Sequence, residues 1–116
     1  MNKELKDEWV AALRSGDYEQ GKNHLRSIDN KFCCLGVLCD LIVKKNPDYI
    51  WTPSKNYYWL EQEENILPDS IMKIAEMQDN AGSYNIEKTP LWELNDLEDK
   101  SFSEIADVIE ENWEKL

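Results

Sequence analysis

Hydrophobic residues recur at the spacing of an α-helix in three stretches of the chain, residues 3–15, 33–45 and 101–113. In the first stretch four apolar residues share one face: Leu5, Trp9, Ala12 and Leu13. Gly16 follows directly and is well placed to end this helix. In the last stretch Ser101 and Glu104 form a capping box, so the helix is expected to start there. Its predicted buried stripe consists of Phe102, Ile105, Ala106, Ile109 and Trp113.

The stretch 33–45 is apolar on nearly all sides, which is typical of the central helix of a domain. Its main stripe is formed by Leu35, Leu38, Cys39 and Ile42. A glycine within a helix costs about 1 kcal/mol relative to alanine. We therefore expect Gly36 to mark the close approach of another backbone segment. Asn46 and Pro47 end the helix.

The middle of the chain has shorter patterns. Aromatic residues at 49–51 and 57–60 flank the turn-like TPSKN and predict a β-hairpin. A helix is expected from Pro68 to about Met77, with inward residues Ile71, Ile74, Ala75 and Met77. Residues 79–88 are expected to be loop, with a third short strand at 83–86 as an alternative, and Thr89-Pro90 to cap a short helix, LWELN.

Together these elements predict an α+β fold, with about four helices packed on a small antiparallel sheet. At 116 residues, the chain is expected to form a single globular domain over 1–116. No segment approaches the roughly 20 apolar residues of a membrane span. The N-terminus has no signal-peptide core, so we expect a cytoplasmic protein, in the cytosol of a host cell if a phage encodes it.

The net charge of −11 is unevenly distributed. Residues 1–45 carry eight Lys/Arg and seven Asp/Glu, whereas residues 46–116 carry five Lys/Arg and seventeen Asp/Glu. An acidic C-terminal portion repels nucleic-acid phosphates, so direct binding of DNA is disfavoured. The same portion could imitate a nucleic acid towards a basic partner, or only keep the protein soluble.

Three cysteines lie in FCCLGVLCD, residues 32–40. Zinc needs about four ligands, and His24 is the only histidine available to complete such a set. A nucleophilic thiol needs a base, again only His24, although a helix N-terminus could lower the pKa of Cys33 or Cys34. Free cysteines otherwise behave as small hydrophobic residues. We therefore expect the thiols to lie in the core, and predict no catalytic residue, no metal and no cofactor.

A cationic segment with hydrogen-bonding side chains, residues 14–31, interrupts this acidic protein. With the hairpin rings it has the ingredients of a nucleotide or phosphate site: guanidinium for charge, and rings for base stacking. The alternative is a solvated loop beside a partly exposed aromatic sheet face, since no P-loop or GxGxxG pattern is present. The predicted ligand-binding residues are Arg14, Tyr18, Gln20, Lys22, His24, Arg26, Trp51, Tyr58 and Trp59.

The blocks WVAALRSGDYEQG (9–21), FCCLGVLCD (32–40), LND (94–96) and SFSEIADVIE (101–110) resemble a family of small uncharacterised proteins encoded by phages and prophages. The resemblance spans all but the middle, 46–90, and supplies no catalytic residues. It implies an accessory protein that counters host defence.

Three functions fit this setting. In the first, which we favour, the protein sequesters a nucleotide-derived signalling molecule without catalysis, as a homo-oligomer that encloses its ligand. In the second, an acidic nucleic-acid mimic blocks a basic host defence protein. In the third, a small enzyme uses Cys33 or Cys34 with His24. The expected partner is therefore a nucleotide-like small molecule or a host protein, with no nucleic acid and no membrane.

Overall fold

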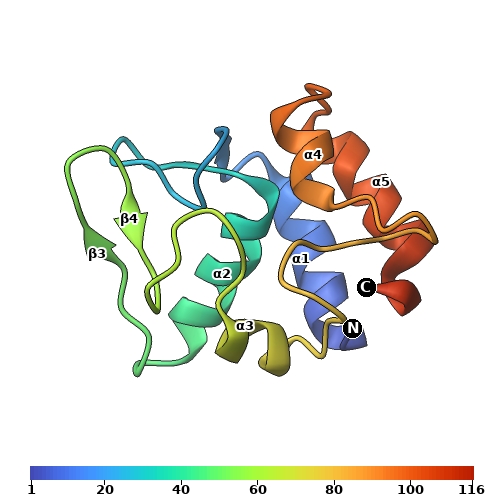
Figure 1. Ribbon diagram of the computed structural model, residues 1–116, viewed down its shortest axis with the longest axis horizontal. Coiled ribbons are helices and arrows are strands. Elements are labelled where there is room, and N and C mark those ends of the chain that lie inside the picture. Colours follow the sequence, from blue (N-terminus) through green and yellow to red (C-terminus); the bar gives the residue numbers. More distant parts are fainter.

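The structure is a computed structural model that describes residues 1–116. The fold is α+β, with five α-helices, four strands of two residues each and a terminal 3₁₀ turn (Figure 1). The elements in chain order are α1 (Lys3–Ser15), β1 (Glu19–Gln20), β2 (Lys31–Phe32), α2 (Cys34–Lys45), β3 (Thr52–Pro53), β4 (Tyr58–Trp59), α3 (Asp69–Ile74), α4 (Leu91–Asp96), α5 (Phe102–Asn112) and η1 (Trp113–Lys115).

Helices α1 and α5 begin and end where the sequence indicates. Gly16 follows α1 in the left-handed conformation, with φ of 81°. Ser101 and Glu104 form the predicted capping box of α5. The buried face of α1 differs from the prediction, because Lys6 and Val10 are buried while Leu5 and Ala12 are only half-buried. The reason is the ion pairing of Lys6 with α5, described below.

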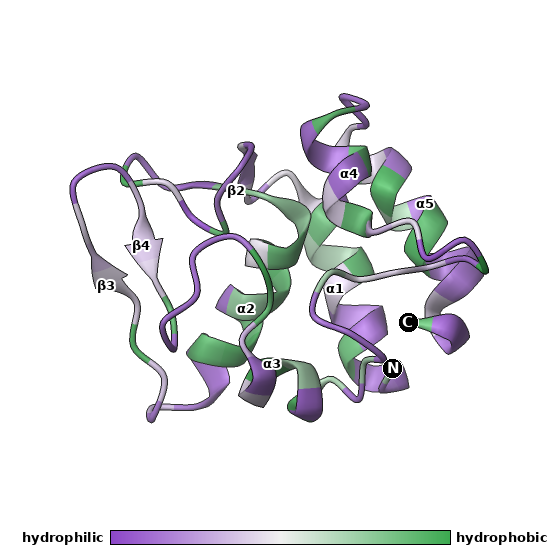
Figure 2. Ribbon diagram, viewed as in Figure 1, coloured by the Kyte–Doolittle hydropathy of each residue, from purple (hydrophilic) through white to green (hydrophobic).

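Helix α2 is the central helix, as predicted. All of its residues from Cys34 to Asp40 are buried, and Figure 2 shows hydrophobic residues along its length. The indole Nε1 of Trp9 on α1 donates to the carbonyl oxygen of Cys34 at 2.9 Å. Cys33, Cys34 and Cys39 are free and buried, which confirms their place in the core.

The predicted single antiparallel sheet is wrong in its details. Two separate two-stranded sheets form, and β1 pairs with β2 in parallel. The antiparallel pair β3–β4 places Thr52 opposite Trp59, so the first strand follows the predicted YIW segment rather than including it. Trp51 turns its indole toward α2 instead, where Nε1 donates to Asp40. Because the strands are so short, the helices bury their apolar faces mainly against one another.

Residues 79–88 form loop and turns, as expected. The alternative, a strand at 83–86, is absent, because Ser83 forms only an isolated bridge with Pro90. The side chain of Asn85 accepts a hydrogen bond from the backbone N–H of Thr89, which holds the segment as a turn. Helix α3 ends at Ile74, because Glu76 adopts a left-handed conformation with φ of 56°, and Ile74 is exposed rather than buried.

None of the helices combines the length and the hydropathy that a membrane crossing requires.

Candidate functional site

The nine predicted ligand-binding residues do not converge on one place. Tyr18, Arg26 and Trp51 surround Phe32, and Tyr58 contacts Arg26 and Trp51. Gln20 and Lys22 lie beside α4, and His24 and Trp59 flank Tyr57. Arg14 on α1 faces Asp107 on α5. Whether any of them binds a ligand stays a prediction. What the structure shows is how each of the side chains is used within the chain.

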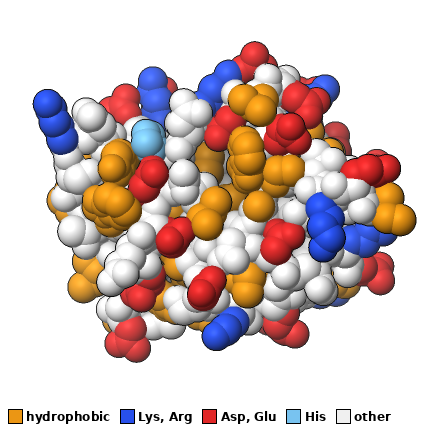
Figure 3. Space-filling view, in the orientation of Figure 1, with side chains coloured by type: hydrophobic (Ala, Val, Ile, Leu, Met, Phe, Trp, Pro, Cys, Tyr) orange, Lys and Arg blue, Asp and Glu red, His pale blue; other side chains and the backbone are white.

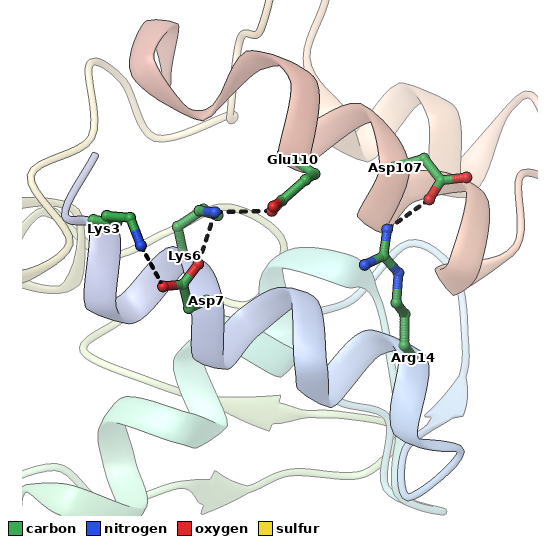
Figure 4. Close-up of polar contacts among 6 residues, drawn as sticks. All are labelled: Lys3, Lys6, Asp7, Arg14, Asp107 and Glu110. Atoms are coloured by element: carbon green, nitrogen blue, oxygen red, sulfur yellow. Dashed lines mark hydrogen bonds and ion pairs between the residues drawn. The ribbon is translucent and has the colours of Figure 1, made fainter.

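Three cations of the N-terminal portion, Lys6, Arg14 and Lys22, bind carboxylates of the C-terminal portion. Nη2 of Arg14 on α1 lies 2.6 Å from Oδ1 of Asp107 on α5 (Figure 4). Lys22 pairs with Asp99 in the same way. Each pair joins segments more than 70 residues apart in sequence. Carboxylates of the same chain therefore neutralise most of the positive charge of residues 14–31.

Lys6 is the most deeply placed of these cations. Its side-chain Nζ lies 2.8 Å from Oε2 of Glu110 and 2.7 Å from Oδ1 of Asp7 (Figure 4). It also lies 5.3 Å from the centre of the Trp113 ring, and the residue is only 3% exposed. Hydrogen bonds to Asp7 and Glu110 raise the pKa of Lys6, because both carboxylates stabilise the ammonium. This residue joins α1 to α5.

His24 has a comparable partner. Its Nδ1 contacts Oε2 of Glu64, and its ring stacks on Tyr57 with 4.5 Å between ring centres. Trp59 packs edge-on against the same Tyr57 ring at 5.4 Å. One ring nitrogen of His24 therefore contacts Glu64, and one face of its ring contacts Tyr57.

Gln20 is bound to the end of α4 and to the segment that follows it. Its Nε2 donates to Oδ1 of the buried Asn95 and to the carbonyl oxygen of Lys100, both at 2.9 Å. The Asn95 amide also donates to the carbonyl oxygen of Gly21 and accepts from the backbone N–H of Cys34. Asn95 therefore joins the backbone at Gly21 to the start of α2, and Gln20 is bound to this network.

Arg26 differs from the other predicted cations because no carboxylate lies within ion-pair distance of it. Nε and Nη2 both donate to Oδ1 of Asn30, at 3.0 and 2.7 Å. The guanidinium carbon lies 4.0 Å from the centre of the Tyr58 ring and within 6 Å of the rings of Phe32 and Trp51. Arg26 is half-buried with its flat face on an aromatic surface.

A buried carboxylate completes this cluster. Asp40 on α2 is 8% exposed and accepts hydrogen bonds from the hydroxyl of Tyr18 at 2.7 Å and from Nε1 of Trp51 at 3.0 Å. Lys44 supplies the positive charge, with Nζ 3.2 Å from Oδ2 of Asp40. Burial raises the pKa of Tyr18, so the phenol stays a proton donor to the carboxylate. Tyr18, Asp40 and Lys44 line a cleft of about 560 Å³.

A model of the family described as domain of unknown function DUF8296 matches residues 1–113. The chain belongs to this family. No curated protein and no solved structure matches the chain. Since the description of DUF8296 gives no function, the function of this member must be argued from its own residues.

The thiols of this DUF8296 member are not activated. Burial raises the pKa of Cys33 to about 12, and the pKa values of Cys34 and Cys39 also lie well above the ordinary value. The alternative in which a helix N-terminus lowers the pKa of Cys33 or Cys34 is not supported, because desolvation raises the pKa of both thiols. Cys33 Sγ accepts from the backbone N–H of Gly36, and no thiol contacts His24 through a hydrogen bond. No group of three or more histidine, cysteine or acidic side chains is arranged to hold a metal ion.

Two features were missed from the sequence. Asp40 could have been found, because it is an acidic residue within the most hydrophobic helix of the domain, CLGVLCDLIVKK. A carboxylate at such a position requires hydrogen-bond donors nearby. The groove beside Trp92, described below, has no local sequence signal, because its residues come from three separate segments.

Proposed function

We propose that this protein acts by binding and not by catalysis, and that it docks through its acidic surface on a basic partner protein, whose normal interactions it blocks. The observation that carries this proposal is the internal pairing of the cationic segment. Arg14 and Lys22 pair with Asp107 and Asp99, so an anionic ligand would have to displace these carboxylates to reach them. The net charge of −11 remains as the property that a partner would meet.

Part of this charge is concentrated at α4. Glu93, Asp96 and Glu98, here named the α4 acidic surface, lie on or directly after the helix, and none pairs with a lysine or arginine. Figure 3 shows carboxylates gathered over α4. Burial and the negative charges of Glu98 and Glu93 together raise the pKa of Tyr84. Such a field attracts a basic surface at long range.

The proposed setting follows from the resemblance to phage and prophage proteins. In that setting the partner is a host defence protein of the cytosol, whose basic surface normally binds nucleic acid. An acidic protein would compete for that surface with a strong dependence on salt, because salt screens attraction between exposed charges.

The proposal is tested by immobilising the protein and passing over it a nuclease-treated lysate of the host cell. The immobilised protein should retain a basic protein at about 50 mM salt and release it at about 500 mM. Glu93→Gln/Glu98→Gln should lose the retained protein, whereas Glu111→Gln/Glu114→Gln, with the same change in charge outside the α4 acidic surface, should keep it. Equal retention by both double variants, or no protein retained, contradicts the proposal.

A second candidate function is the sequestration of a nucleotide-derived signalling molecule. The observation that favours it is Arg26, which lies against Tyr58 with no carboxylate partner and keeps guanidinium N–H groups for a phosphate. A nucleotide, cyclic dinucleotide or ADP-ribose derivative should then raise the melting temperature. Arg26→Ala should abolish that shift and Arg14→Ala should not, since Arg14 is already paired with Asp107. A panel without any shift excludes this candidate.

A further inference from the structure

We propose that a groove beside Trp92 receives an arginine side chain of the basic partner. This inference rests on the proposed docking function and assigns a defined contact to it. The groove has a volume of about 340 Å³ and lies between α4 and the segment before α3. Its lining consists of Asn23, Asn65, Ile66, Trp92 and Asp96.

The polar groups of this groove are largely unused within the chain. The indole N–H of Trp92 and the side-chain amides of Asn23 and Asn65 form no hydrogen bond with another residue. The carboxylate of Asp96 accepts one hydrogen bond, from Nδ2 of Asn95 at 2.7 Å, and has no cationic partner. A carboxylate has about four acceptor positions, so most of those on Asp96 are open.

The larger cleft at Asp40 differs in this respect. There the carboxylate already binds Tyr18, Trp51 and Lys44, and the amide oxygen of Asn30 is taken by Arg26. These polar groups at the Asp40 cleft already have hydrogen-bond or ion-pair partners within the chain. The groove at Trp92 instead offers donors, acceptors and an aromatic ring to a partner.

An arginine side chain is the occupant that the groove fits best. Its guanidinium can lie on the half-buried Trp92 ring and donate to Asp96 at the same time. Its methylene groups can pack on Ile66. Charge complementarity points the same way, because Asp96 of the α4 acidic surface lines the groove and no lysine or arginine does. Lysine lacks the planar group that stacks, so it should bind more weakly.

Titration of the ¹⁵N-labelled protein with the peptide acetyl-Gly-Arg-Gly-amide tests the proposal by NMR. The indole N–H signal of Trp92 and the side-chain amide signals of Asn23 and Asn65 should move most. The four other indole signals should move little. The lysine peptide should bind more weakly, and the citrulline peptide, which has nearly the same shape without the charge, should not bind.

A matched pair of variants separates the groove from general attraction. Asp96→Asn should weaken the arginine peptide about fivefold, as expected for loss of one partly exposed ion pair, whereas Glu111→Gln should leave its affinity unchanged. Equal weakening by both variants, or signal changes spread over the whole surface, would overturn the groove while leaving the docking function standing. If the arginine peptide shifts the Trp92 signal as expected but the lysate capture retains no basic protein, the docking function is overturned instead.

Discussion

The carbonyl oxygen of Leu25 lies where a β carbon on Gly36 would stand. A β carbon built at Gly36 would be 1.7 Å from that oxygen and 2.6 Å from the carbonyl carbon. The same oxygen accepts a hydrogen bond from the backbone N–H of Cys33 at 3.3 Å. The segment that carries the cationic residues is therefore packed directly on the start of the central helix.

Gly36→Ala should lower the free energy of unfolding by about 4 kcal/mol or more, because two backbone segments would have to separate. Gly16→Ala is the matched control: its β carbon would meet nothing within 4 Å, and only its φ of 81° opposes the change. The left-handed conformation should make this change cost about 1 kcal/mol. Urea unfolding followed by far-UV circular dichroism measures both. Similar losses in the two variants would contradict the packing described here.

The two ion pairs between α1 and α5 should contribute unequally. Lys6→Ala removes a buried ammonium with two carboxylate partners and a ring contact, and should cost about 2 kcal/mol. Arg14→Ala removes a pair in which both side chains are exposed, and should cost less than about 1 kcal/mol. Chemical denaturation at moderate salt distinguishes the two. An Arg14→Ala loss equal to that of Lys6→Ala would show that burial does not decide the strength of these pairs.

The buried thiols should make the protein less stable in alkali. The pKa of Cys33 rises from an ordinary 9.0 to about 12 on folding. Above about pH 9 the unfolded chain loses the thiol proton while the folded chain keeps it, so stability falls as the pH rises toward 12. The slope from one such thiol is at most about 1.4 kcal/mol per pH unit. Urea unfolding from pH 7.5 to 10 measures it, below the range where tyrosines dominate.

Cys33→Ala should give a flatter pH dependence than the parent protein, whatever its effect on stability at neutral pH. The native protein should also react slowly with a thiol reagent at pH 8, and quickly in denaturant. Rapid reaction of the native protein would mean that the thiols are accessible, and the non-catalytic interpretation would fail.

The donors to Asp40 should each stabilise the fold. Tyr18→Phe and Trp51→Phe remove one hydrogen bond apiece from a carboxylate that is 8% exposed, and each should cost about 1 to 3 kcal/mol. Lys44→Met should cost less, because the Lys44 side chain is 65% exposed and water can replace it. A larger loss for Lys44→Met than for Tyr18→Phe would contradict this ranking.

The sequence predicts those parts of the fold that depend on local chemistry. The capping box at Ser101, the left-handed Gly16 and the apolar character of α2 are each properties of a few neighbouring residues. The close backbone approach at Gly36 could be predicted, because a glycine inside a helix lowers its stability unless a larger residue would not fit. The strand pairings were harder to predict, since two-residue strands carry almost no period, and Trp51 packs toward Asp40 instead of joining the hairpin.

The arrangement of the candidate site residues could not be predicted from local sequence patterns, for a different reason. Arg14 and Lys22 suggest an anion site only while their partners are unknown. Those partners lie 93 residues away for Arg14 and 77 for Lys22. Ion pairs over such separations depend on how α1 packs on α5 and on where α4 lies. A short stretch of sequence contains neither relationship.

The central claim is that the chain presents negative charge to a partner and uses its own cations internally. The most direct test is the melting temperature of the protein with two sets of ligands, nucleotides and arginine-rich peptides, at about 50 mM salt. The account predicts stabilisation by the peptides, lost at about 500 mM salt, and none by any nucleotide. Stabilisation by a nucleotide, with none by the peptides, would contradict it.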